Sequence, residues 1–116
     1  MNKIVLRKNG GFYCAYGNDC YILNYLFDYK ITDDRVGFPT SAYEKVVKIL
    51  EQNNINYESS TEIYDCKKKN NYNKFFELGK RKCKLRYRIE KIIEKMNSLN
   101  EKEIDEILDF IEKYER

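Results

Sequence analysis

Three aromatic side chains lie close together near the start of the chain, and they are candidates for contacting a nucleic-acid base: Phe12, Tyr13 and Tyr16. Alternation along a strand would place Phe12 and Tyr16 on one face and Tyr13 on the other. An exposed aromatic ring can stack on a base or wedge between bases, which contributes roughly 1–3 kcal/mol per base. The alternative is core packing, because one of the two faces must be buried.

A second group of candidate residues is basic. Residues 67–96 hold twelve Lys and Arg against three Asp and Glu, whereas residues 1–66 hold seven against nine and residues 97–116 hold three against seven. Steps of three to four residues place four basic residues on one face of a helix: Lys80, Lys84, Arg88 and Lys91. Such a stripe favours phosphate contacts that release counterions. The alternative is a solvated face, partly neutralised by the acidic segment that follows.

The other residue types argue against catalysis. Histidine is absent, so the commonest general base near neutral pH and the commonest metal ligand are both missing. The Gly10-Gly11 pair lacks the Lys-Ser/Thr of a P-loop. No C-x-x-C pair that would begin a zinc or redox site occurs among the four cysteines: Cys14, Cys20, Cys66 and Cys83. We therefore expect buried, reduced thiols in a protein that is not an enzyme and has no cofactor and no metal.

Length and hydropathy indicate one small folded protein. The 116 residues suffice for a single domain with one core, and 42% hydrophobic residues are typical of a folded chain. The apolar run Ile4–Leu6 near the N-terminus is far shorter than a signal peptide or a membrane span. We expect a cytoplasmic protein that contacts no membrane.

The elements that must position the aromatic residues form a predicted α/β unit over residues 1–64. An Asn-Gly turn at Asn9 predicts a hairpin, because both turn positions need positive φ, and this hairpin joins strands at residues 4–7 and 12–16. The dense apolar residues that follow predict a short buried helix over residues 19–27, with Asn18 as its N-cap.

A second strand pair is predicted around Asp33-Asp34, between residues 29–32 and residues 35–38. Ser41 and Glu44 have the spacing of a capping box, which predicts a helix from there to about Asn53. Ile55–Tyr57 then returns to the sheet edge.

The polar, basic composition of residues 65–71 predicts a linker. After it we expect a helical hairpin over residues 72–116 that packs on the same core. Its first helix, at about residues 72–96, carries the basic stripe. Its second helix is acidic, and Asn100 with Glu103 predicts a capping box at its start. One apolar face of this helix combines Ile104, Ile107, Leu108, Ile111 and Tyr114.

Two segments of the N-terminal unit resemble domain I of the MutS mismatch-repair proteins. Gly10–Cys20 resembles the family's G-D-F-Y-E-x-F-x-x-D-A segment. Val36–Tyr43, followed by Leu50 and Ile55–Tyr57, is similar to its A-G-I-P-x-H-A segment, helix and return strand, in the same order. The resemblance covers about residues 3–60. It implies a mixed sheet with helices packed around it, from the part of MutS that touches DNA at the mismatch.

In that family the Phe of the F-x-E motif wedges into the base stack, and the Glu bonds to the mispaired base. Phe12 stands at the position of this Phe. Cys14 stands where the Glu would be, Ser41 replaces the motif's His and Gly11 replaces its Asp. A thiol cannot replace a carboxylate as an acceptor. The resemblance thus implies DNA contact through Phe12 without the residue that reads the mispaired base.

Together these patterns predict a non-catalytic module that binds DNA or RNA through the aromatic hairpin and the basic helix, without sequence-specific readout. One alternative is an inhibitor or adaptor from a phage or mobile element, similar to an anti-CRISPR protein. It would bind a nucleic-acid enzyme such as a CRISPR effector, and the acidic last helix could face a basic groove on that partner. A third hypothesis is a structural homodimer built on the C-terminal helices.

Overall fold

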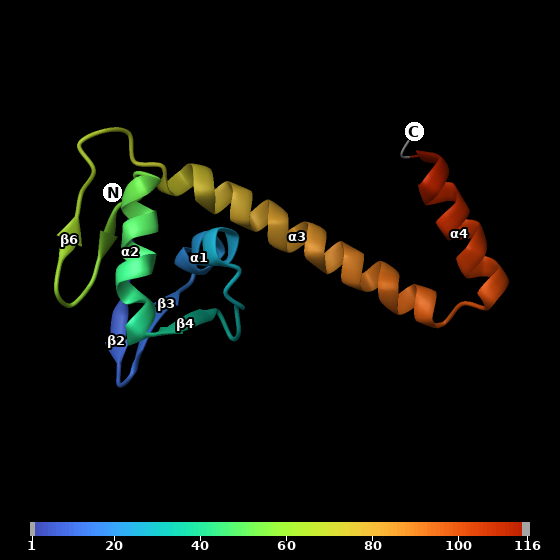
Figure 1. Cartoon of the computed structure of the whole chain (residues 1–116), viewed down its shortest axis with the longest axis horizontal. Coiled ribbons are helices and arrows are strands. Elements are labelled where there is room, and N and C mark those ends of the chain that lie inside the picture. The colour runs from blue at the N-terminus through green and yellow to red at the C-terminus, as the bar shows by residue number, and fades with distance from the viewer. Residues whose placement is uncertain (1, 115–116) are drawn as a thin grey trace. The chain divides into compact units, whose positions relative to one another are not determined.

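A computed structural model describes residues 2–114, which form two three-stranded sheets and four α-helices (Figure 1). Residues 1, 115 and 116, which fall in the predicted 1–64 and 72–116 segments, lie outside the described residues. The strands are β1 (Ile4–Val5), β2 (Arg7–Asn9), β3 (Phe12–Tyr16), β4 (Arg35–Pro39), β5 (Tyr57–Glu58) and β6 (Ile63–Tyr64). The helices are α1 (Asp19–Phe27), the short 3-10 helix Thr40–Ala42, α2 (Tyr43–Gln52), α3 (Tyr72–Asn97) and α4 (Glu101–Tyr114). The predicted fold class, in which helices pack on β-sheet (α/β or α+β), is confirmed as α+β.

The chain divides into two compact units, which we call the first unit (Met1–Cys83) and the second unit (Lys84–Arg116). The boundary falls inside α3, whereas the sequence predicted it at residues 65–71. The reason is that the first turns of α3 belong to the core of the first unit, where Tyr72, Phe75 and Gly79 are buried.

Asparagine side chains hold the predicted linker against the first unit. The Asn71 backbone N–H donates to the Asn54 carbonyl at 2.9 Å, and its side-chain amide donates to the Asn53 carbonyl at 2.9 Å. The Asn70 side chain donates to the Asn2 carbonyl at 2.7 Å. These bonds fix the chain where it enters α3.

The N-terminal segment divides between the two sheets. β1 pairs in parallel with β5, and β5 pairs antiparallel with β6, a short strand that the sequence patterns did not predict. β2 and β3 form the predicted hairpin, but its two turn residues are Gly10, at a φ of 61°, and Gly11, because Asn9 ends β2 and pairs with Phe12. The predicted strand at residues 4–7 is therefore two strands, separated by the buried residue Leu6.

The second predicted strand pair is wrong. β4 pairs along its whole length with β3, and its only backbone pairing with residues 29–32 among the described residues is an isolated bridge between Thr32 and Arg35. Asp33 and Asp34 adopt φ values of 51° and 60° in the turn between them. All five residues of β4 pair with β3, whereas a pairing with residues 29–32 would offer at most four partners.

Two of the three predicted helix caps are not made. Asn18 is the N-cap of α1, but its side chain makes no capping hydrogen bond. The N-cap of α2 is Ala42, since Ser41 lies inside the 3-10 turn that precedes the helix. The box at α4 is confirmed: the Glu103 N–H donates to Asn100 Oδ1 at 2.8 Å, and the Asn100 N–H donates to Glu103 Oε1 at 3.4 Å.

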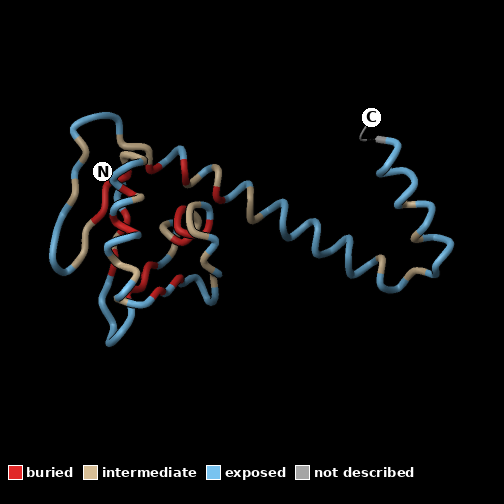
Figure 2. The backbone as a smooth tube through the Cα atoms, in the orientation of Figure 1, coloured by how far each residue is buried: buried red, intermediate tan, exposed pale blue. Residues whose placement is uncertain are grey.

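The buried residues gather in the first unit (Figure 2). Tyr57, Phe38 and Leu50 are among the largest side chains that are fully buried. Asp19 lies at the rim of this core, where its carboxylate accepts hydrogen bonds from the Tyr72 hydroxyl and the Val5 N–H. Burial raises the pKa of the Asp19 carboxyl group. The two bonds link α1 to both β1 and α3.

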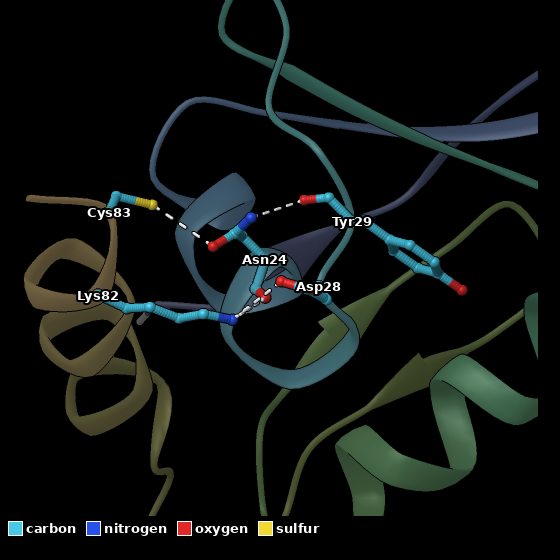
Figure 3. A network of polar contacts seen from close by, with 5 residues as sticks. All are labelled: Asn24, Asp28, Tyr29, Lys82 and Cys83. Carbon is cyan, nitrogen blue, oxygen red and sulfur yellow. Dashed lines mark hydrogen bonds and ion pairs between the residues drawn. The ribbon is translucent and has the colours of Figure 1, made fainter. Parts of the chain in front are cut away.

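A polar network joins the end of α1 to α3 (Figure 3). The buried Asn24 amide donates to the Tyr29 carbonyl at 2.9 Å and accepts from the Cys83 thiol at 3.5 Å. Lys82 Nζ donates to the Asn24 carbonyl and to Asp28, both at 3.2 Å. All of these groups belong to the first unit. The hydrogen bonds from Lys82 and Cys83 hold this part of α3 against the end of α1.

The second unit exposes apolar side chains on both of its helices. Leu85, Ile89, Ile92 and Ile93 of α3 and Leu108 and Ile111 of α4 are each about half exposed. The packing of these two helices against each other therefore stays a prediction. Across residues 2–114, none of the helices combines the length and the apolar character that crossing a membrane requires.

Gly79 permits the close contact between α3 and α1. A Cβ at this position would lie 2.2 Å from the Tyr21 carbonyl oxygen, which is backbone and cannot turn aside. We expect Gly79→Ala to lower the free energy of unfolding by about 2 kcal/mol or more, because forced repacking outweighs the gain of about 1 kcal/mol in helix propensity. Urea denaturation measures the change. Gly11→Ala is the matched control, since nothing lies within 4 Å of a Cβ there, and an equal loss in both variants would contradict this role of Gly79.

Candidate nucleic-acid interface

The sheet formed by β2, β3 and β4 has one face on the core and one face toward solvent. Along β3 and β4, Tyr13, Ala15, Val36 and Phe38 are buried in the core. Strand alternation turns their neighbours the other way. The ladder places Arg7, Cys14 and Gly37 in one row across the strands, Asn9 and Phe12 in the next, and Tyr16 beside Arg35. We call this surface the outer sheet face.

Two of the three predicted aromatic residues lie on the outer sheet face. Phe12 is 55% exposed and Tyr16 is 46% exposed. Tyr13 is only 5% exposed, and its ring stacks on Tyr43 and Phe38 with centroid distances of 4.7 and 5.9 Å. Tyr13 is thus a core residue and not a binding residue, because β3 alternation sends it to the opposite face from Phe12.

A hollow of about 380 Å³ lies on this face beside Phe12. Cys14 and Gly37, which pair across β3 and β4, form part of its lining. Cys14 is buried, and Gly37 has no side chain, so neither residue fills the hollow. The lining contains two basic residues and no acidic one: Asn9, Phe12, Cys14, Lys30, Thr32, Arg35 and Gly37. An anion that enters this hollow would meet positive charge only.

Three basic residues of this region were not among the candidates from the sequence: Arg7, Lys30 and Arg35. All three are exposed, and within residues 2–114 no salt bridge joins any of them to a carboxylate. Arg7 comes from β2 and Arg35 from β4, so strand pairing brings these two to one face. Lys30 comes from the segment before β4 and lines the hollow with Arg35. The two-residue period of a strand places Arg7 on the same face as Asn9, and Arg35 on the same face as Gly37, so the sequence contained a signal for both arginines. Using that signal requires knowledge of the strand register, which the sequence alone did not give.

The predicted basic stripe lies on the exposed surface of α3. Lys80, Lys84, Arg88 and Lys91 are all exposed, and none of them forms a salt bridge with an acidic residue of α4 within the described part of the chain. Lys91 pairs instead with Glu94 at 3.5 Å. Lys80 belongs to the first unit and the other three residues belong to the second. Phosphate binding by the stripe therefore stays a prediction of the helix sequence.

A larger hollow of about 840 Å³ lies beside α2 and is acidic. Glu44, Glu51 and Glu62 line it with one lysine, Lys48. The Tyr43 hydroxyl donates to Glu62 at 2.6 Å, and burial raises the pKa of this phenol. Three carboxylates in one hollow repel phosphate, which leaves the outer sheet face as the better candidate for nucleic acid.

No protein-family model, curated protein or solved structure matches the chain. The resemblance to MutS domain I rests on the two sequence segments quoted above.

The burial difference between neighbouring aromatic residues predicts opposite effects on stability. Phe12→Ala should change the free energy of unfolding by less than about 1 kcal/mol, because the ring is largely in water. Tyr13→Ala should cost about 3–5 kcal/mol, because it empties a stacked site in the core. Chemical denaturation of both variants provides the comparison. A large loss for Phe12→Ala would mean that this ring serves the core and does not face a ligand.

Proposed function

We propose that this protein binds DNA or RNA on the outer sheet face, without sequence-specific readout and without catalysis. One observation carries the proposal. Two exposed aromatic rings share a surface with three basic residues that have no carboxylate partner among the described residues: Phe12, Tyr16, Arg7, Lys30 and Arg35. Aromatic rings next to cations on a sheet are the combination that stacks bases and tracks phosphates.

The spacing of the rings favours a single strand over an intact duplex. Phe12 and Tyr16 lie four residues apart on one strand, which places their backbones roughly 13 Å from each other at 3.3 Å per residue. A flexible single strand can present a separate base to each ring, whereas the bases of a duplex are already stacked. Arg35 opposite Tyr16 is positioned to contact the adjoining phosphate.

The resemblance to MutS domain I supports the same residue. Phe12 stands at the position of the wedging Phe in that family, and its ring is exposed. Cys14 stands at the position of the family's Glu and is only 5% exposed. A buried thiol offers neither the charge nor the reach of that carboxylate. We therefore expect no preference for mismatched over matched duplex.

Phe12→Ala should weaken binding of a labelled single strand by roughly 1–3 kcal/mol, which is about 5- to 150-fold in Kd. The slope of log K against log salt should stay nearly constant, because removing a ring does not change the number of counterions released. Fluorescence anisotropy at several salt concentrations measures both quantities. Tyr87→Ala is the matched control, since Tyr87 is an exposed aromatic residue on α3 at 60% exposure. Equal weakening by both variants would remove Phe12 from the site.

Arg7→Ala combined with Arg35→Ala should reduce the salt slope by about 1 for each phosphate that the protein then fails to neutralise, alike for all sequences. Lys45→Ala with Lys48→Ala removes the same charge from exposed positions of α2 and should change the slope little. If the unaltered protein binds no DNA or RNA at low ionic strength, the proposal fails and the protein-binding alternative takes its place.

A further inference from the structure

We infer that the second unit is a homodimerisation module, in which the basic side of α3 from one copy packs beside the acidic side of α4 from another. This interface is separate from the outer sheet face and goes beyond the proposed nucleic-acid binding.

Both helices of the second unit carry an exposed apolar seam. Leu85, Ile89 and Ile92 follow each other at steps of four and three residues, which is the spacing of a coiled-coil seam. Leu108 and Ile111 continue the same kind of seam on α4. All five side chains are about half exposed in a single copy of the chain. An apolar seam of this length is stable in water only when another helix covers it.

The size of the second unit favours a second copy as that cover. It has 33 residues, and chains below about 40 residues usually need a disulfide, a metal or oligomerisation to hold a core. Its sequence contains no cysteine, since Cys83 ends the first unit. No cluster of three or more metal-binding side chains occurs among the described residues. Oligomerisation is the remaining route, and pairing two copies would place four helices around one core.

Charge decides which helix faces which. From residue 84 to residue 97, α3 carries five basic and two acidic side chains, whereas α4 carries six acidic and two basic ones. Two copies of α3 would repel each other, and so would two copies of α4, while α3 attracts α4. Helical spacing places Lys84 and Arg88 along one edge of the α3 seam, and Asp105 and Glu112 along one edge of the α4 seam.

The arrangement gives the predicted basic stripe a different role. Lys84 and Arg88 would face carboxylates of the second copy instead of phosphates. Replacing both with Ala should then weaken association of the chains and leave unchanged the salt slope of nucleic-acid binding to the outer sheet face.

Sedimentation equilibrium of the full chain, without nucleic acid, tests the inference directly. We expect the unaltered protein to show twice the chain mass of 14.0 kDa. Ile89→Asp should give the single mass, because it puts a charge into the seam. Tyr87→Asp is the matched control on the same helix, where helical spacing places it far from the seam, and it should keep the double mass. A single mass for the unaltered protein, or a double mass for Ile89→Asp, would overturn the inference.

Charge reversal separates association between copies from a hairpin within one copy. Lys84→Glu with Arg88→Glu makes both helices acidic, and Asp105→Lys with Glu112→Lys weakens the acidity of α4, so each double variant should lose mass when alone. Mixing the two should restore the double mass, since the acidic α3 of one variant can then pair with the altered α4 of the other. A hairpin closed within each chain predicts no restoration. Because the readout is mass alone, a failed dimer leaves the nucleic-acid proposal standing, and the reverse also holds.

Discussion

Side-chain alternation along β3 is the constraint on which both the core and the proposed binding face depend. β3 is paired on both edges, by β2 and by β4, so its register cannot slip by one residue without exchanging the two faces. In the observed register Tyr13 completes an aromatic stack with Tyr43 and Phe38. The same register leaves Phe12 and Tyr16 in solvent. The stability of the core therefore holds the two exposed rings in place.

Helix α3 runs through both units, and its apolar side chains are packed in the first unit but mostly exposed in the second. Its first turns are held by burial of Tyr72 and Phe75, by the close approach at Gly79 and by the polar network around Asn24. Beyond Cys83 the helix carries alternating apolar and basic residues that are exposed in a single copy. The start of the helix belongs to the fold of the first unit, and the remainder carries the exposed apolar side chains from which we infer the dimer contact.

Acidic and basic side chains gather on different surfaces of the protein. The hollow beside α2 has three glutamates, the outer sheet face has three exposed basic residues, and the second unit has a basic helix followed by an acidic one. Surfaces of opposite sign have different partners, because a phosphate chain approaches one and is repelled by another. The net charge of +3 conceals this separation.

Local signals in the sequence determined the helices and the hairpin. The hairpin between β2 and β3, the apolar spacing of α3 and α4 and the Asn100–Glu103 box each depend on residues within a few positions, so they could be predicted, although the two turn residues are Gly10 and Gly11 and not Asn9 and Gly10. The partner of β4, the start of α2 and the burial of Tyr13 depend on contacts between distant segments. For the same reason the sequence supplied Phe12 and Tyr16 as candidates but not Arg7, Lys30 and Arg35. The strand register brings Arg7 and Arg35 to the rings, and the fold of the segment before β4 brings Lys30 to the hollow beside Phe12. Tertiary packing sets both, so neither could be predicted from residues within a few positions.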